Sequence, residues 1–135
     1  MSSVGGDILE ITYNHPTVGT GRFFAKSNED GQFDLGGFRV NDDANGISGD
    51  GGIIKQLNQV RWKVECTVAS DMNTRLDMEK AVALCGSPVD ANWTFSHING
   101  TVYAGTGCPV GDYSMNTNQA TFPLVIAGGG KLAKQ

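Results

Sequence analysis

The chain has 135 residues and a formal net charge of −4, with 18% charged and 39% hydrophobic residues. This length suits one domain with a modest core, and the composition is typical of a water-soluble globular protein. An acidic chain of this kind is not expected to wrap DNA by neutralising its phosphates. Nineteen glycines are well above the usual frequency of about 7%, which favours many turns and a mainly β fold.

The positions of the charged residues and of the cysteines narrow the possible class of protein further. All of the net charge comes from the first half, because residues 1–60 hold eight acidic and four basic side chains and residues 61–135 hold six of each. Three cysteines without a C-x-x-C spacing argue against a disulfide framework or a zinc site and fit a reducing compartment. The start, MSSVGGDILE, lacks the features of a secretory signal, and no apolar run approaches the ~20 residues of a membrane helix.

Strands are predicted first over residues 7–14, 21–26 and 32–35, which are rich in β-forming side chains. The clearest pattern covers residues 56–69, where apolar and polar side chains alternate, so we expect a long strand with one buried and one wet face. The apolar members are Val60, Trp62, Val64, Cys66 and Val68, and the polar members are Gln59, Arg61, Lys63, Glu65 and Thr67.

One helix is predicted after this strand. Asp71, Asn73 and Thr74 are candidate N-caps, and Gly86 and Pro88 end the pattern. The apolar positions lie broadly on one side, which we expect to face the core. They are Leu76, Met78, Val82, Leu84 and Cys85.

Three more strands are predicted over residues 91–98, 101–105 and 119–127, and Asn99-Gly100 joins the first two as a hairpin turn. A run of glycines then leads into a short tail over residues 128–135. The whole chain, 1–135, therefore reads as a single domain. We expect a β-sandwich or barrel of about seven strands with one α-helix packed on it.

The segment 35–54, LGGFRVNDDANGISGDGGII, combines turn-forming residues with large apolar side chains. Stretches of this length without clear regular structure are uncommon inside a compact domain and are usually functional or disordered. Disorder is disfavoured here, because burying apolar surface is worth about 25 cal/mol per Å². The segment is therefore expected to fold back on its own sheet or to bury itself against a neighbouring subunit.

No motif predicts catalysis, a cofactor or a metal. The stretch 41–46 matches the first half of a calcium-binding loop, but Gly52 occupies the twelfth position, where a carboxylate is needed. His15, expected in a turn, and His97, expected as a packed or interfacial ring, have no local partner motif for nucleophilic catalysis. We expect a protein that is not an enzyme and whose function lies in its surface.

Several short segments, spread over nearly the whole chain, carry a resemblance to a known family. They are FDLGGF (33–38), GISGDG (46–51), QVRWKVE (59–65), the single helix, INGTVY (98–103), NTNQATFPL (116–124) and GGGKL (128–132). In this order, and in a chain of this length without catalytic motifs, they resemble the tail tube proteins of contractile-tailed, Mu-like bacteriophages.

The resemblance implies two packed antiparallel sheets with a flanking helix, and rings of six subunits whose inner sheets join into one β-barrel. Stacked rings would form a hollow tube that conducts genomic DNA inside a contractile sheath. In this family a long loop after the early strands reaches the neighbouring ring, and the segment 35–54 sits in the matching place. The inter-ring contact would then involve Leu35, Gly36, Gly37, Phe38, Arg39, Val40, Ile47, Ile53 and Ile54.

The implied partners are further copies of the chain, the tail sheath protein, and the baseplate and tail terminator proteins. DNA would pass through the lumen without specific binding, and the protein would be located in the virion tail after assembly in the host cytoplasm. The polar strand face is a candidate for the lumen or for a subunit contact. Its members are Gln59, Arg61, Lys63, Glu65 and Thr67.

Three alternatives remain open. The chain could be the tube subunit of a related injection or secretion machine, such as a pyocin or a type VI needle. It could be a monomeric β-sandwich binding module, which requires a concave pocket with convergent polar groups. It could be a small hydrolase that uses His15 or His97.

Overall fold

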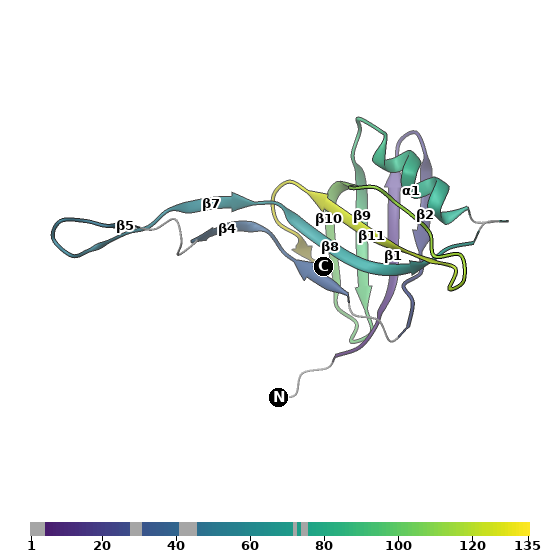
Figure 1. The fold of residues 1–135 in the computed structure, drawn as a ribbon, viewed down its shortest axis with the longest axis horizontal. Coiled ribbons are helices and arrows are strands. Elements are labelled where there is room, and N and C mark those ends of the chain that lie inside the picture. The colour runs from purple at the N-terminus through teal and green to yellow at the C-terminus, as the bar shows by residue number, and fades with distance from the viewer. Residues whose placement is uncertain (1–4, 28–30, 41–45, 72, 74–75) are drawn as a thin grey trace.

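A computed structural model describes residues 5–27, 31–40, 46–71, 73 and 76–135 (Figure 1). The early strands are β1 (Ile8–His15), β2 (Gly19–Phe23) and β3 (Gln32–Asp34). Four short strands follow: β4 (Gly37–Val40), β5 (Gly46–Ile47), β6 (Ile53–Ile54) and β7 (Leu57–Val60). The remaining elements are β8 (Trp62–Ala69), α1 (Asp77–Cys85), β9 (Ala91–His97), β10 (Val102–Pro109), β11 (Thr121–Gly128) and β12 (Ala133–Lys134).

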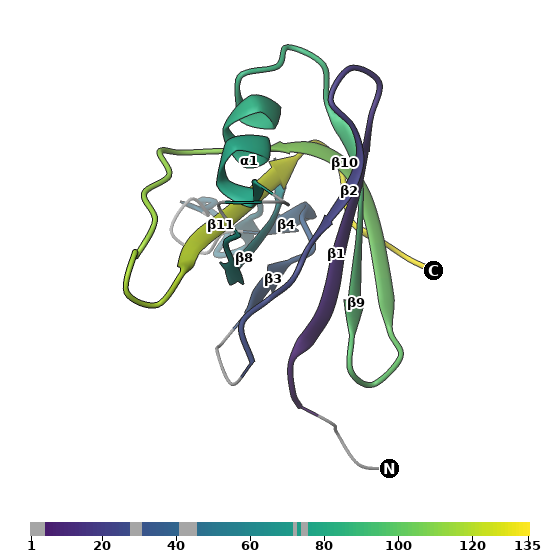
Figure 2. The ribbon, with the colours of Figure 1, turned by 90° about the vertical axis from the view of Figure 1, so that its right-hand side faces the viewer.

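The body of the molecule comprises β1 to β3, β8 to β12 and α1, and its strands form two antiparallel layers (Figure 2). Their order is β2-β1-β9-β10-β11-β8-β3, and β12 adds to β10. Strand β10 joins the layers, because residues 102–107 pair with β9 whereas Cys108 and Pro109 pair with β11. At the opposite corner, Ala25 forms a bridge with Val68. The predicted mainly β fold with antiparallel sheets and one helix is confirmed.

Aromatic side chains fill the space between the layers. The largest fully buried residues include Trp62, Trp93, Phe23, Phe95 and Phe122. The Trp93 ring lies nearly parallel to those of Phe23 and Phe95, with centroids 6.2 and 6.4 Å apart. Such ring pairs add about 0.5–1.5 kcal/mol each beyond the burial of their area. The large rings of the core therefore come from strands of both layers, β2 and β9 on one side and β8 and β11 on the other.

At three glycines of the body a side chain would clash with the Trp62 indole, and at Gly107 and Gly128 it would also clash with the backbone of the neighbouring strand. A Cβ at Gly105, Gly107 or Gly128 would lie 3.1, 2.8 or 2.7 Å from an indole atom. Since real Cβ contacts are rarely this short, the ring can lie flat on strands β10 and β11 only where these side chains are absent. Part of the glycine excess in the composition thus serves packing rather than turns.

The alternating pattern after residue 60 predicted its buried face correctly. Trp62, Val64, Cys66 and Val68 are buried in β8, whereas the residues between them are half-exposed. The predicted single strand over 56–69, however, is two strands that separate at Arg61. The reason is their partners, because β7 pairs with β4 and β8 pairs with β11 and β3.

The helix begins later than predicted and without the predicted caps. Leu76 precedes it in a left-handed conformation (φ 52°) and no side chain caps the first turn. Asp71 instead accepts a hydrogen bond from the Asn73 N–H (2.8 Å), and the third candidate, Thr74, lies outside the described residues. The buried positions are Asp77, Ala81 and Leu84, at i, i+4 and i+7.

The predicted apolar face of the helix is wrong at two positions, because Leu76 and Val82 are exposed. The C-terminal segment also differs from a free tail. Leu132 is buried and donates its N–H to the Leu35 carbonyl (2.9 Å), and β12 then pairs with β10. The end of the chain is therefore part of the body and is attached to the residue that precedes the projecting hairpin described below.

Candidate assembly surface on a projecting arm

The segment that the sequence left without regular structure is a β-hairpin. Strand β4 pairs with β7, and β5 pairs with β6, both antiparallel. We call residues 37–60 the arm, of which 41–45 lie outside the described residues. Figure 1 shows the arm leaving the body and extending far beyond the two layers. Its glycines and aspartates had suggested an irregular path, whereas backbone pairing across the hairpin gives it two short sheets.

Glycine 36 connects the arm to the body. Its φ is +73°, and a Cβ there would lie 2.7 Å from the Gly130 carbonyl oxygen and from the Trp62 nitrogen. Gly36 also forms a bridge with Lys131 of the C-terminal segment. The backbone can make this tight change of direction only without a side chain, so Gly36 fixes where the arm begins.

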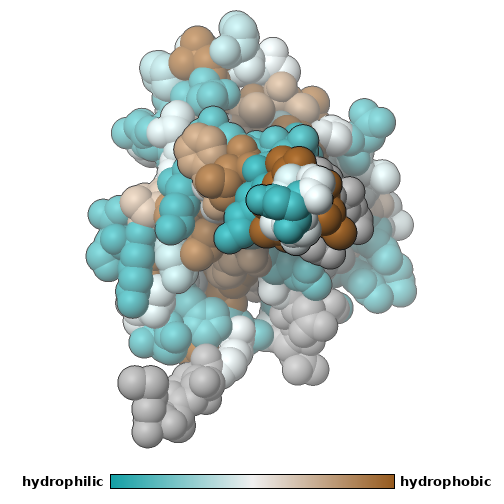
Figure 3. All heavy atoms as spheres, turned by 90° about the vertical axis from the view of Figure 1, so that its left-hand side faces the viewer, coloured by the Kyte–Doolittle hydropathy of each residue, from teal (hydrophilic) through white to brown (hydrophobic). Residues whose placement is uncertain are grey.

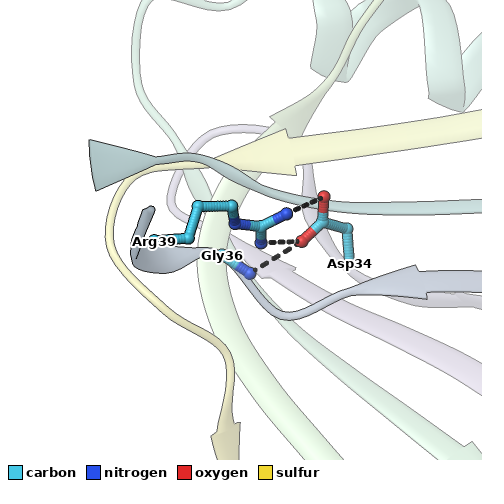
Figure 4. A network of polar contacts seen from close by, with 3 residues as sticks. All are labelled: Asp34, Gly36 and Arg39. Carbon is cyan, nitrogen blue, oxygen red and sulfur yellow. Dashed lines mark hydrogen bonds and ion pairs between the residues drawn. The ribbon is translucent and has the colours of Figure 1, made fainter. Parts of the chain in front are cut away.

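A polar cluster holds the first residues of the arm (Figure 4). The Asp34 carboxylate accepts hydrogen bonds from Arg39 Nη2 (2.6 Å) and from the Gly36 N–H (3.1 Å). These donors favour the charged carboxylate, so the Arg39 contact first and the Gly36 contact second lower the pKa of Asp34 below its usual value of 3.8. The last residue of β3 is thus connected through its side chain to the first strand of the arm.

The tip of the arm is a tight turn over residues 48–52. The Ser48 N–H donates to the Gly52 carbonyl (2.7 Å), and the Gly51 N–H donates to the Ser48 carbonyl (2.9 Å). The Asp50 carboxylate accepts from the Ser48 hydroxyl and from the Gly52 N–H, and these contacts lower the pKa of Asp50. The turn therefore has a defined internal geometry although it lies far from the core.

The arm exposes its large apolar side chains. Ile47 is 79% exposed, Phe38 71% and Leu57 65%, and Val40, Ile53 and Ile54 are exposed as well. Figure 3 looks at the molecule from the side of the arm and shows hydrophobic residues on its surface. An isolated two-stranded hairpin is at best marginally stable in water, and fully burying one such side chain is worth roughly 1.5–3 kcal/mol. The arm therefore has the composition of a surface that a partner covers.

The structure assigns different places to the residues predicted for the inter-ring contact. Phe38, Arg39, Val40, Ile47, Ile53 and Ile54 lie on the arm. Gly36 and Gly37 lie at its base, and Leu35 packs against the core of the body. Leu57 also lies exposed on the arm, and the sequence could not assign it there, because residues 56–69 read as one body strand.

The predicted polar strand face does not form one continuous surface. Gln59 lies in β7 of the arm, and Arg61 lies between β7 and β8. Lys63, Glu65 and Thr67 lie on the outward side of β8, where Lys63 Nζ is 2.5 Å from Glu65 Oε1. The face thus divides between the arm and the body at the point where the two strands separate.

His15 is a structural residue in this geometry. It closes β1 and is 2% exposed, rather than lying in a turn. Its Nδ1 accepts the N–H groups of Thr17 and Val18, both at 3.0 Å, so the ring proton is on Nε2. Nε2 lies 2.9 Å from the Val89 carbonyl and 3.0 Å from Ser87 Oγ. A nitrogen that already carries the proton cannot act as a base toward Ser87, so the geometry gives the hydrolase alternative no support here.

His97 has a similar arrangement on the surface. Its Nδ1 accepts the Asn99 N–H (3.2 Å), and its Nε2 lies 3.1 Å from the Gly6 carbonyl. Within the described residues, no three His, Cys, Asp or Glu side chains are grouped to hold a metal ion. The calcium-like residues 41–45 lie outside this part of the chain. In the same part, no helix has the length and apolar composition needed to cross a membrane.

Two depressions on the described surface lie on outer faces of the body. One lies over β9 and β10 between Asn92 and Thr106, and another lies beside the start of α1, next to Met78 and Met115. They differ from the concave pocket that the binding-module alternative requires.

Comparison with known proteins adds no relative, because neither a family model nor a curated protein matches the chain. The arm is therefore the candidate functional site.

Proposed function

We propose that the chain is a structural subunit of the tail tube of a contractile-tailed bacteriophage. Copies would stack as hexameric rings into a hollow tube that conducts genomic DNA during ejection. The observation that carries this proposal is the arm, a hairpin with six exposed large apolar side chains that projects from a well-packed body. The arm also occupies the position at which the sequence resemblance implies a contact with the neighbouring ring.

The shape of the arm favours a particular kind of assembly. It extends from one side of the body, so an arm that contacts the body of another copy leaves that copy's own arm free for the next contact. Contacts of this head-to-tail type form closed rings or open-ended stacks rather than dimers. In a protein that works as a monomer, the exposed side chains of Phe38, Ile47 and Leu57 would stay in water, which is unfavourable for large apolar groups.

The tube subunit of a related injection or secretion machine would use the same arm. A phage tail and such a machine would share the rings and their stacking, and only the cargo and the neighbouring proteins would differ. The arm therefore supports the self-assembling tube subunit first, and the phage tail is the form that we propose because of the sequence resemblance.

An armless variant tests the proposal. Gly37 and Val60 are paired across the hairpin, so residues 38–59 can be replaced by an Asn-Gly turn without disturbing the body. We expect the wild-type protein to form tubes or six-membered rings in negative-stain electron microscopy, and the armless variant to stay folded but to form no stacked tubes. Long tubes from the armless variant, or a wild-type protein that is monomeric at every concentration, would contradict the proposal.

A milder change tests the apolar contact itself. Ile47 and Ile53 are paired at the tip, and both are exposed, so Ile47→Ser with Ile53→Ser should leave the subunit folded. We expect the critical concentration for assembly to rise at least about tenfold, which corresponds to about 1.4 kcal/mol. Val82→Ser on α1 is the matched control, because Val82 is an exposed apolar residue outside the arm. Light scattering against concentration measures the difference.

A further inference from the structure

One face of the body consists mainly of short, uncharged polar side chains. Strands β2, β1, β9 and β10 lie side by side in that order. The alternating burial of the first three, and the register of β10 against β9, identify the outward positions. We call these outward positions the hydroxyl–amide face. Its central members are Thr12, Asn14, Thr20, Asn92, Thr94 and Thr106.

The strand register arranges these side chains in rows across the sheet. Asn14 is paired with Thr20 on one side and with Asn92 on the other. Asn92 is in turn paired with Thr106, whose hydroxyl donates to the Asn92 side-chain oxygen (3.0 Å). In the next row, Thr12 is paired with Thr94. Thr94 is in turn paired with Ala104 of β10. The rows thus present mainly hydroxyl and amide groups, together with small apolar side chains.

The charge on this face is balanced. Its outward positions include one cation, Arg22, and one anion, Glu10, which form an ion pair at 3.5 Å. Tight binding of nucleic acid depends on several lysines or arginines that neutralise phosphates. A face whose arginine already has a carboxylate partner has little to hold a phosphate chain.

The hydroxyl–amide face also lacks the anchors of a protein interface. On these four strands, Leu9 is the exposed large apolar residue, at an irregularity near the start of β1. Interface cores usually contain buried aromatic or large apolar side chains, and the arm supplies several of these. The hydroxyl–amide face is therefore suited to remain in contact with water after assembly.

We infer that the hydroxyl–amide face lines the channel of the assembly, where a polyanion such as double-stranded DNA slides past without being held. This inference rests on the proposed tube function and adds which surface faces the cargo. For the polar strand face that the sequence indicated as a candidate for the lumen or for a subunit contact, the inference favours the subunit contact. The part of that face on β8 carries the charged residues Lys63 and Glu65 and lies next to the start of the arm at Arg61, so we place it with the subunit contacts.

Thiol labelling tests the assignment. The background is Cys85→Ser with Cys108→Ser, and Cys66 can remain because burial raises the pKa of its thiol to about 12. Thr94→Cys then places one reactive thiol in the centre of the face. We expect a 5-kDa polyethylene glycol maleimide to label it at least about tenfold more slowly in tubes than in free subunits. We expect N-ethylmaleimide, which is small, to label it at similar rates in both.

Each result of this experiment has a consequence. Fast labelling of the Thr94→Cys tubes by the large reagent would place the face on the outside and overturn the inference. Slow labelling by both reagents would place it inside a subunit contact and also overturn it. If tubes form and neither result is seen, the proposed function and the inference both stand. If the wild-type protein forms no tubes, the proposed function fails, and the inference fails with it.

A charge variant tests whether DNA passes along the hydroxyl–amide face. Thr94→Lys would place one lysine per subunit on the face, and Thr67→Lys on the outward side of β8 is the matched control. We expect tubes of Thr94→Lys to retain a short DNA duplex at low salt and to release it as salt rises, while wild-type tubes retain none. Retention by wild-type tubes, or by Thr67→Lys and not by Thr94→Lys, would contradict the inference.

Discussion

The body and the arm contain similar apolar residues, but these side chains are buried in the body and exposed on the arm. In the body, Phe95 is fully buried and its ring contacts those of Phe33, Trp62 and Trp93. In the arm, Phe38 is exposed and its strand has one partner strand and no second layer. The body buries its apolar side chains within one subunit, whereas those of the arm would be buried only by contact with another molecule. This difference is the physical basis of the proposed assembly.

The strongest test of the comparison exchanges one phenylalanine in each region for alanine. Phe95→Ala removes a fully buried ring, so we expect the free energy of unfolding to fall by about 3–5 kcal/mol. Phe38→Ala should change it by less than about 0.5 kcal/mol, because the side chain is exposed in the subunit. Urea unfolding of both variants measures this. A large loss of stability in Phe38→Ala would show that the arm packs on its own body.

A smaller effect is expected at the junction of the two regions. Gly36→Ala places a Cβ 2.7 Å from backbone atoms at a φ of +73°, so we expect a loss of roughly 1–3 kcal/mol in unfolding free energy and a defect in assembly. Gly129→Ala is the control, because a Cβ there meets nothing within 4 Å. Circular dichroism during thermal unfolding gives the stability. Equal behaviour of the two variants would mean that Gly36 does not fix the path of the arm.

The smallest expected effect is a pH dependence of the contacts that Asp34 makes where the arm begins. The folded-state pKa of Asp34 is lowered by Arg39 and by the Gly36 N–H, so their contacts are fully present above about pH 4 and are lost as the pH falls through the lowered pKa. We expect Asp34→Asn to remove this acid dependence. Amide NMR signals of Gly36 and of the arm, followed from pH 6 downward, report the change.

The control for this titration lies at the other end of the arm. The pKa of Asp50 is also lowered, by Ser48 and then by the Gly52 N–H, but Asp50 contacts only the tip. Asp50→Asn should therefore change the signals of residues 48–52 and leave those of Gly36 unaltered. If Gly36 titrates identically in wild type and in Asp34→Asn, the Asp34 carboxylate does not hold the base of the arm.

Local sequence patterns predicted the parts of the fold that depend on neighbours in the chain. The alternation from Trp62 to Val68 identified the buried face of β8, and Asn99-Gly100 marked the turn between β9 and β10. The apolar residues of the segment 35–54 were also recognised as unusual for a loop, although the sequence left open whether they fold back on the same subunit or contact another one. Each of these features depends on side-chain period or on turn chemistry, which a short stretch of sequence contains in full.

Other features required partners that lie far away in the chain. The separation of β7 from β8 at Arg61 follows from their different partner strands, and the helix start at Asp77 follows from packing rather than from a cap. His15 became buried because residues 87–89 supply its hydrogen bonds. No local pattern contains this information, since each outcome depends on segments that meet only in the folded chain.

The sequence by itself therefore determined a mainly β domain, the buried side of β8 and the apolar character of the arm. Only the tertiary structure decided that the arm is a hairpin outside the body, because strand pairing and the lack of a covering layer are not local properties. It alone also decided the hydroxyl–amide face, since Thr12 and Thr94 come from distant segments. The register between strands decides which side chains share a surface. That register is fixed when one face of the sheet is buried against the core.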